Sequence, residues 1–315
     1  MTFQRKAVID VGTNSVKLLV AETDGRVVRP LLEQSEQTRL GRGFFQTHQL
    51  QSEAIGATAR AVADFARTAA ERGAAATRVI GTSAARDARN QAALLAAIRQ
   101  AAGLPIEILT GEQEADLVFL GVASDPRLAG QPLLILDVGG GSTEFILGEG
   151  DTPHFRQSFR LGSVRLLEQC RPADPPAAAA LSECMGRLFG FLRAEVRPRL
   201  APVLAAPRSR PVQLVGTGGA ASILASMQLG LPAFDRDRIE AERLTRAQVR
   251  RQLERLWSLP LAERRRIAGL PPERADVMLT GAAIYAAVLE EFGLPDLRVS
   301  TRGLRFAALM AANWF

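Results

Sequence analysis

The stretch Asp137-Val-Gly-Gly-Gly-Ser-Thr-Glu144 closes a short apolar run that starts at Pro132, and a second apolar run follows it. This pattern predicts a strand, a tight loop and a second strand. A related stretch, Asp10-Val-Gly-Thr-Asn-Ser15, has the same setting near the start of the chain. Because Asp, Gly and Ser or Thr recur in corresponding places, we expect two copies of one strand-loop-strand unit.

Both loops combine residue types that suit a phosphate group. Glycine lets backbone N–H groups approach an anion without interference from Cβ, and hydroxyls add donors. A single Asp-x-Gly turn can be a plain hairpin, but its duplication favours ligand binding. Neither loop has the pattern of a P-loop or of a dinucleotide-binding loop. The predicted phosphate-binding residues are Gly12, Thr13, Asn14, Ser15, Lys17, Gly139, Gly140, Gly141, Ser142 and Thr143.

Composition predicts an enzyme of two modest domains. The chain has 315 residues and 47% hydrophobic content, enough for two cores. It contains no apolar run of about 20 residues, and Met1 to Asp10 lacks the apolar region of a signal peptide, so we expect a cytoplasmic protein with no membrane partner. The net charge is +6, but only 5% of residues are aromatic, so no nucleic-acid partner is expected. A positive field would instead help to capture a small or linear polyanion.

The sequence offers few nitrogen or sulfur ligands for a metal ion. His48 and His154 are isolated in the sequence. Cys170 and Cys184 lack the C-x-x-C spacing of a metal or redox site, so we expect them to be reduced cysteines that serve in packing. Any divalent ion must therefore rely on oxygen ligands, which indicates Mg²⁺ or Mn²⁺ rather than zinc.

Strand and helix patterns alternate along the chain. The expected strands cover 8–11, 16–21, 26–33, 78–82, 106–109, 155–160 and 212–216, and the expected helices cover 52–72, 88–102, 112–123 and 177–204. This order predicts a repeated α/β domain with a cleft between the copies, where ligands bind at the carboxyl ends of the strands.

Further motifs carry a resemblance to a known family. They include Gly81-Thr-Ser-Ala-Ala-Arg-Asp-Ala-Arg-Asn90, Thr110-Gly-Glu-Gln-Glu-Ala115, Leu161-Gly-Ser-Val-Arg165, Gly216-Thr-Gly-Gly219, Arg274-Ala-Asp-Val277 and Ser300-Thr-Arg-Gly-Leu-Arg305. With the two loops, they make the chain resemble the Ppx/GppA phosphatases of the actin, sugar kinase and Hsp70-like superfamily. The resemblance implies two ribonuclease-H-like domains with an interdomain cleft, at residues 1–124 and 125–302, and a terminal helix at 303–315 that packs back on the first domain.

The resemblance also implies roles for charged residues. Glu114 matches the family's catalytic glutamate and would orient and deprotonate the attacking water. In an arbitrary sequence, Glu112 and Glu114 would merely favour a helix N-terminus through its dipole. Arg86 matches an arginine directed at the phosphate. Asp137 and Glu144 would hold Mg²⁺, with Asp10 as a third oxygen ligand.

The expected activity is Mg²⁺-dependent release of orthophosphate from the end of inorganic polyphosphate. Alternatives are hydrolysis of guanosine pentaphosphate (pppGpp), a kinase-like phosphotransferase, and a silent sensor that binds polyphosphate or alarmone. Three departures from the family leave substrate preference open: Lys17 where Arg is commoner, Phe306 where Glu is usual, and a Gly216–Gly219 loop without a following Lys or Arg. Because the chain stops soon after Arg305, we expect a short channel for polyphosphate. The sequence does not decide between a monomer and a homodimer.

Overall fold

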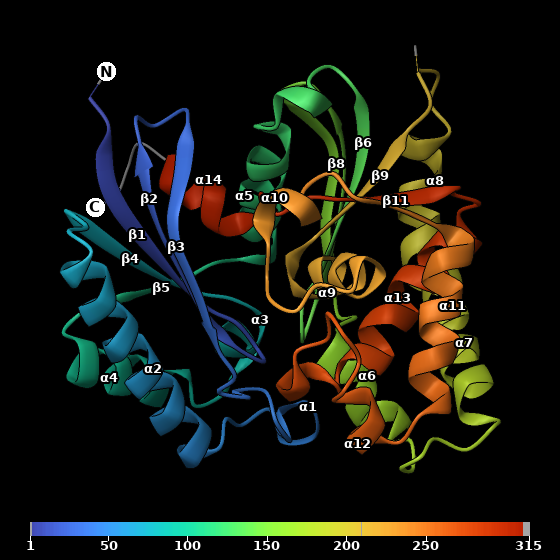
Figure 1. The fold of residues 1–315 in the computed structure, drawn as a ribbon, viewed down its shortest axis with the longest axis horizontal. Helices are drawn as coiled ribbons and strands as arrows, with labels where there is room; N and C mark the ends of the chain where they lie inside the picture. The colour runs from blue at the N-terminus through green and yellow to red at the C-terminus, as the bar shows by residue number, and fades with distance from the viewer. Residues whose placement is uncertain (1, 209, 311–315) are drawn as a thin grey trace. The chain divides into compact units, whose positions relative to one another are not determined.

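The computed structural model describes residues 2–208 and 210–310. The chain divides into two compact units, each with its own sheet (Figure 1). Unit 1 holds the residues up to Gly121 and those from Leu304 onward, and unit 2 holds Val122–Gly303. The α/β class expected from the sequence is confirmed in both units.

Unit 1 is built on a mixed five-stranded sheet in the order β3-β2-β1-β4-β5. The strands β1, β2 and β3 are antiparallel neighbours, whereas β4 and β5 continue the sheet in parallel with β1. The strands are β1 (Gln4–Val11), β2 (Val16–Thr23), β3 (Val28–Glu36), β4 (Ala76–Gly81) and β5 (Ile106–Ile108). The helices are α1 (Phe44–Thr47), α2 (Ser52–Glu71), α3 (Ser83–Asp87), α4 (Gln91–Ala102), α5 (Gly111–Ala123), which begins in this unit, and α14 (Leu304–Met310).

The C-terminal helix α14 belongs to unit 1 although the whole of unit 2 precedes it in sequence. It packs on β1, β2 and β3. Arg305 anchors it, since its guanidinium donates to the Leu18 carbonyl at 2.9 Å and pairs with Glu33 at 3.2 Å. Phe306 is buried at 4% exposure, which an aromatic side chain tolerates far better than a carboxylate. The last part of the expected terminal helix, 311–315, lies outside the described residues.

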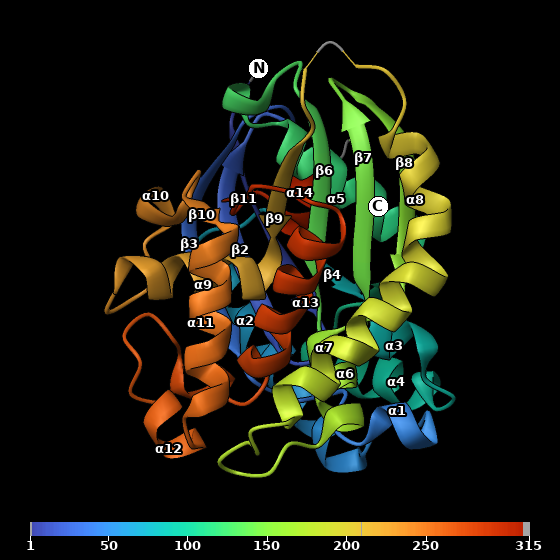
Figure 2. The same cartoon turned by 90° about the vertical axis from the view of Figure 1, so that its right-hand side faces the viewer.

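Unit 2 is built on a six-stranded sheet in the order β10-β11-β9-β6-β7-β8. Helix α13 lies between α11 and α7 in Figure 2 and contacts both. The strands are β6 (Pro132–Val138), β7 (Thr143–Glu149), β8 (Thr152–Phe159), β9 (Gln213–Thr217), β10 (Arg243–Thr245) and β11 (Asp296–Val299). The helical segments are η1 (Pro126–Leu128), α6 (Ser163–Cys170), α7 (Ala180–Phe191), η2 (Leu192–Val196), α8 (Arg197–Leu204), α9 (Gly218–Leu229), α10 (Arg236–Ile239), α11 (Arg246–Ser258), α12 (Leu261–Arg264), η3 (Pro272–Arg274) and α13 (Met278–Glu291).

The two sheets repeat one topology. In each, a three-stranded antiparallel meander is extended by parallel strands from the side of its first strand, as β3-β2-β1-β4-β5 and as β8-β7-β6-β9-β11. Strand β10 is an addition at the outer edge of unit 2, antiparallel to β11. The internal duplication predicted from the two glycine loops therefore extends over all five strands of unit 1 and the five corresponding strands of unit 2.

Local sequence explains where the observed elements depart from expectation. The helix expected over 177–204 is interrupted by the π-helical turn η2, and Pro198, just after it, cannot donate the N–H that a continuous helix requires. Only helices were expected after the Gly216–Gly219 turn, and strands β10 and β11 correct this, because three and four residues are too few for a periodic signal. The last residue of β10, Thr245, starts α11 with a capping box to Gln248. Over the described ranges, no helix has the length and apolar character needed to cross a bilayer.

Two glycines in unit 2 allow a stability prediction that separates the cost of a left-handed backbone from the cost of a steric clash. Gly269 and Gly230 both have positive φ, at 83° and 61°. A Cβ on Gly269 would lie 2.2 Å from the Ser226 carbonyl oxygen, whereas nothing lies within 4 Å of one on Gly230. Gly230→Ala should lower the free energy of unfolding by about 1–2 kcal/mol because of the left-handed backbone. Gly269→Ala should cost a further ~1–3 kcal/mol because of the backbone clash.

Chemical denaturation of both variants beside the parent protein measures the difference. Equal losses of stability would mean that the Ser226 contact relaxes freely.

Candidate functional site

The first glycine loop joins β1 to β2 and is closed by a backbone hydrogen bond. Gly12 N–H donates to the Ser15 carbonyl at 3.0 Å, just beyond the last ladder pair of the hairpin, Val11 with Val16. The carbonyls of Thr13 and Asn14 accept from the N–H groups of Gly41 at 2.7 Å and Arg39 at 2.9 Å. Glycine is needed at 41, since a Cβ there would lie 2.3 Å from Thr13 Cγ2. The loop is thus held from outside by the segment 39–41.

Asp10 stands opposite Lys17 across the β1–β2 ladder, so their side chains lie on the same face of the sheet. Its Oδ1 is buried and has no hydrogen-bond partner among the described residues. Burial raises the pKa of Asp10, and the positive charges of Lys17 and Arg305 partly offset this. Asp10 therefore has one oxygen available for a cation or a proton donor, while Lys17 supplies a positive charge beside the loop.

The second glycine loop joins β6 to β7 and repeats the closure of the first. Gly139 N–H donates to the Ser142 carbonyl at 3.0 Å, beyond the ladder pair Val138 with Thr143. The N-terminus of α6 holds this loop: the N–H groups of Ser163, Val164 and Arg165 donate to its carbonyls at 2.9–3.0 Å.

Further contacts fix the second loop against α6. The Arg165 Nε donates to the Gly141 carbonyl at 2.8 Å. A Cβ on Gly162 would lie 2.4 Å from the Gly140 oxygen, so only glycine permits this approach. The Thr143 hydroxyl donates to the Leu161 carbonyl at 2.5 Å, and Thr143 is fully buried. Since its proton is used by the backbone, Thr143 is a structural member of the loop in this arrangement.

Asp137 and Glu144 form a cross-strand pair at the end of the β6–β7 hairpin. Directly opposed residues of an antiparallel ladder project on the same face, so two carboxylates stand side by side, which costs free energy unless a cation or proton offsets it. Glu144 is 1% exposed and accepts a hydrogen bond from Ser158 Oγ at 2.7 Å. Asp137 Oδ1 lies against Gly218, where a Cβ would approach it to 2.3 Å. An oxygen-only, doubly anionic donor set fits Mg²⁺.

These two carboxylates alone do not complete a metal site. Over the described part of the chain, no group of three His, Cys, Asp or Glu side chains is gathered closely enough to hold an ion. Mg²⁺ commonly keeps several waters and binds through one or two carboxylates plus substrate phosphates, so the pair suffices for that mode of binding. Asp10, the third expected ligand, belongs to unit 1, whereas Asp137 and Glu144 belong to unit 2.

Glu114 and Arg86 are in direct contact in unit 1. Arg86 Nη1 lies 2.9 Å from Glu114 Oε2 and also donates to the Leu109 carbonyl at 3.1 Å. Glu114 is 7% exposed and lies in the first turns of α5, whose N-terminus has a reciprocal cap between Thr110 and Gln113. The sequence assigned the two side chains separate roles; the structure shows that they form one unit, with the arginine fixing the orientation of the carboxylate.

Two residues near the loops were missed by the sequence reasoning. The hydroxyls of Ser83 and Thr217 are buried and, among the described residues, have no hydrogen-bond partner. Ser83 lies two residues beyond the carboxyl end of β4, and Thr217 is the last residue of β9, just as Asp10 lies next to the last residue of β1. Unsatisfied buried polar atoms are rare and costly, so their gathering at strand ends indicates places where a ligand completes the bonding. The signal in the sequence is a Gly-Thr pair at the end of a strand, with the hydroxyl either in the pair, as in Thr217, or directly after it, as in Ser83.

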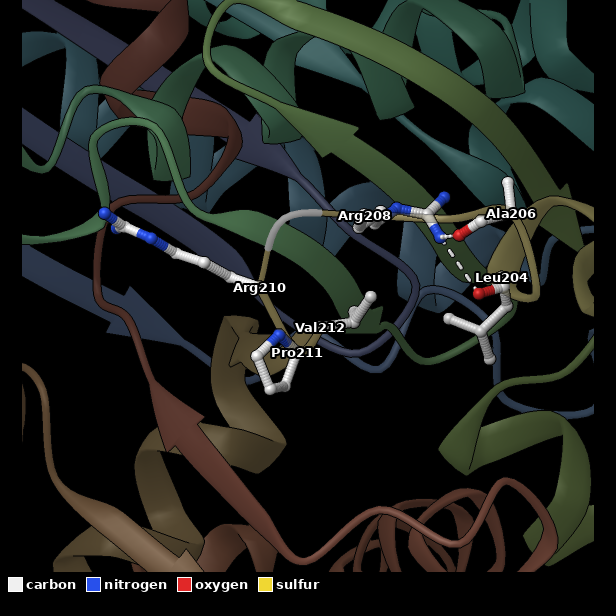
Figure 3. A pocket seen from close by; sticks show the side chains of 6 residues that line it. All are labelled: Leu204, Ala206, Arg208, Arg210, Pro211 and Val212. Atoms are coloured by element: carbon white, nitrogen blue, oxygen red, sulfur yellow. Dashed lines mark hydrogen bonds between the residues drawn. The ribbon is translucent and has the colours of Figure 1, made fainter.

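A separate surface pocket of about 390 Å³ lies at the other end of the unit 2 sheet (Figure 3). Its lining residues precede β9, whereas Thr217 ends that strand and Gly218 follows it. Arg208 donates to the carbonyls of Val203, Leu204 and Ala206 at 2.7–2.9 Å, so it caps the end of α8. The pocket is therefore remote from the glycine loop of its own unit. It is lined by Leu204, Ala206, Arg208, Arg210, Pro211 and Val212.

Known proteins resemble this chain over nearly its full length. Exopolyphosphatase 2 of Mycobacterium tuberculosis is 33% identical, over 95% of this chain and 96% of that protein. The guanosine-5'-triphosphate,3'-diphosphate pyrophosphatase of Vibrio vulnificus is 28% identical, over 95% of this chain but 57% of that protein. The crystal structure of an exopolyphosphatase from Cytophaga hutchinsonii superimposes with a TM-score of 0.85 and 27% identity, over 97% of this chain and 96% of the other.

Residues 19–311 match the sequence profile of the Ppx/GppA phosphatase family. This match and the structural likeness confirm two predictions from the sequence, a hydrolytic enzyme and a two-domain fold of the actin, sugar kinase and Hsp70-like type. The chain belongs to the Ppx/GppA phosphatase family.

Proposed function

We propose that the protein is an exopolyphosphatase that hydrolyses the terminal phosphoanhydride of inorganic polyphosphate with Mg²⁺. The observation that carries this proposal is the Asp137–Glu144 pair at the mouth of a glycine loop. Two carboxylates across a hairpin provide the charge for a cation, and the adjoining loop provides small residues that let phosphate oxygens approach the backbone. A relative that matches almost end to end is named an exopolyphosphatase, which supports the choice of polyphosphate.

Asp137 and Glu144 would hold the cation, which supplies neutralisation of the charge on the phosphate oxygens. Gly140, Gly141 and Ser142 would bind a phosphate through backbone and hydroxyl donors, and Gly139, whose N–H closes the loop, would leave room for the phosphate oxygens. In unit 1, the loop from Gly12 to Ser15 and the ammonium of Lys17 would do the same. Both loops are rigidly closed by their own hydrogen bonds, so little reorganisation is needed when an anion binds.

Glu114 would orient the attacking water and accept its proton. The carboxylate is buried and held by Arg86, so its position is fixed before substrate binds. Phosphoryl transfer has a loose transition state that demands little from a base beyond orientation. A carboxylate kept in place by an arginine is suited to that task. Arg86 has further donors with which it could contact a phosphate oxygen.

Hydrolysis of guanosine pentaphosphate is the second candidate, because one family member is named for that substrate. The same residues would act on either anhydride, so the difference lies in recognition of the guanosine. A third candidate is a sensor that binds without catalysis. The presence of Glu114, Asp137 and Glu144, two of them almost fully buried, favours an enzyme.

Replacement of Glu114 tests the role of the base. Glu114→Gln keeps the shape of the side chain but cannot accept a proton, so kcat should fall by roughly a hundred- to ten-thousandfold while polyphosphate binding persists. Phosphate release and equilibrium binding measure the two effects. Glu112→Gln, an exposed position on the first turn of the same helix, is the matched control and should stay active. Turnover of Glu114→Gln within a few-fold of the parent would remove Glu114 from the mechanism.

Replacement of the paired carboxylates tests the cation site. Asp137→Asn and Glu144→Gln should each raise the Mg²⁺ concentration needed for half-maximal activity, because each removes one anionic oxygen ligand. Excess Mg²⁺ should restore a single variant more fully than the double variant. Glu149→Gln, at the opposite end of β7, controls for the loss of a charge. An unchanged Mg²⁺ titration in the double variant would place the ion elsewhere.

A comparison of substrates distinguishes an exopolyphosphatase from a guanosine pentaphosphate hydrolase. Apart from the single hydroxyl of Thr217, the segment from Gly216 to Ala221 carries only glycine and alanine, so kcat/KM for short polyphosphate should exceed that for guanosine pentaphosphate. Activity should also fall with added salt, since loop cations act on the substrate partly at long range. Steady-state assays at matched ionic strength, with ATP as a third substrate, decide this. A higher kcat/KM for the alarmone would identify an alarmone phosphatase, and binding without release of phosphate would identify a sensor.

A further inference from the structure

The only tyrosine of the sequence, Tyr285, lies in the middle of the unit 2 core. It belongs to α13, a helix whose residues from Met278 to Leu289 are all buried. A helix of this kind is normally filled with apolar side chains, because each buried hydroxyl must find a partner to offset its lost hydration. The hydroxyl of Tyr285 therefore needs an explanation that apolar packing does not supply.

The Tyr285 hydroxyl lies between two backbone carbonyls of the central strands. It is 3.1 Å from the carbonyl oxygen of Leu136 in β6 and 3.0 Å from that of Thr217 in β9. Leu136 directly precedes Asp137, and Thr217 directly precedes Gly218, the residue against which Asp137 Oδ1 rests. Asp137 and Thr217 are also the last ladder partners of the two strands. The hydroxyl thus joins β6 and β9 at the point where they separate around Asp137.

The backbone makes room for this ring at one position. A Cβ on Gly216 would lie 2.9 Å from Tyr285 Cε1 and 2.7 Å from Leu297 Cδ1. The glycine of the Gly216–Gly219 loop therefore forms one wall of a slot for the tyrosine ring, which gives this loop a role other than contact with a nucleotide. Any side chain at 216 would displace the ring and with it the hydroxyl.

The hydroxyl stays protonated and can serve only as a donor to these carbonyls. Burial and the negative charge of Asp137 both raise the pKa of Tyr285 well above its ordinary value. The hydroxyl has one proton and two acceptor carbonyls at nearly equal distance. Its hydrogen bond is therefore shared between β6 and β9.

We propose that Tyr285 is a positioning residue for the cation site: its hydroxyl holds the ends of β6 and β9 so that Asp137 is set for a divalent ion. This inference rests on the proposed function, because it requires a cation at Asp137. Groups that orient a metal ligand from behind are often worth ten- to a hundredfold in metal affinity. Here the Tyr285 hydroxyl contacts the backbone next to Asp137 and does not contact the carboxylate of Asp137 itself.

Binding of Mn²⁺ to the full-length protein without substrate tests the proposal, using the EPR signal of the free ion. Tyr285→Phe retains the ring and removes only the hydroxyl, so its affinity for Mn²⁺ should fall roughly tenfold. At saturating Mg²⁺ its kcat should stay close to that of the parent. Trp257→Phe is the matched control, because it removes another buried aromatic donor, 3.0 Å from the Leu279 carbonyl on the same helix. The control should bind Mn²⁺ as the parent does.

A second measurement uses the parent protein and so does not depend on the stability of the variant. Selective ¹³C labelling of tyrosine gives a single NMR signal, which should shift during Mg²⁺ titration and should not shift in Asp137→Asn. Equal Mn²⁺ affinity of Tyr285→Phe and the parent, or a signal that Mg²⁺ leaves unmoved while the parent binds the ion, would overturn the role of Tyr285 alone. Absence of Mn²⁺ binding by the parent would overturn the cation site itself.

Discussion

One short backbone hydrogen bond recurs at the centre of each unit, and the candidate sites depend on it. Gly12 donates to Ser15 and Gly139 donates to Ser142, both at 3.0 Å. In each case a Cβ on the glycine would come within 3.1 Å of the accepting oxygen, so the turn favours glycine. The bond closes the loop immediately after the Asp at the end of a strand. It thereby fixes the carboxylate and the loop as one rigid group at the carboxyl end of the sheet.

The two copies of this group have diverged in charge. The residue opposite the aspartate is Lys17 in unit 1 and Glu144 in unit 2. With lysine, the pair is close to neutral and supports binding of an anion. With glutamate, the pair carries two negative charges on one face of the hairpin and favours a cation. In the proposed function, this single difference between the duplicated hairpins would separate a phosphate-binding role from a metal-binding role.

Much of the fold could be predicted from the sequence because the loops and their flanking apolar runs are local patterns. The strand-loop-strand units, the long helix α2 and the repeated α/β order follow from spacing and composition. Two kinds of feature could not be predicted. Strands β10 and β11 are too short for a periodic signal, and the sequence pattern did not distinguish the π-helical turn η2 from the helix expected around it.

Candidate site residues could be named from the sequence, but the contacts among them could not. The resemblance to the Ppx/GppA phosphatases singles out Arg86 and Glu114, but they are 28 positions apart, and only the fold shows that they form an ion pair. Ser83 and Thr217 were missed because a single hydroxyl after a strand is common, and what distinguishes these two is the lack of a partner. The contacts of Tyr285 were even harder to predict, because its hydroxyl donates to carbonyls of residues 149 and 68 positions away in the sequence.

The way α6 meets the second loop also decides how an anion can bind there. The first N–H groups of a helix commonly attract phosphate, since they have no partner within the helix. In α6 the N–H groups of Ser163, Val164 and Arg165 already donate to the carbonyls of Gly139 and Gly140. The dipole of this helix is thus used to hold the loop. A phosphate bound as proposed would then contact the N–H groups of the loop, whose carbonyls accept from α6, so the helix would act on the ligand only through the loop that it fixes.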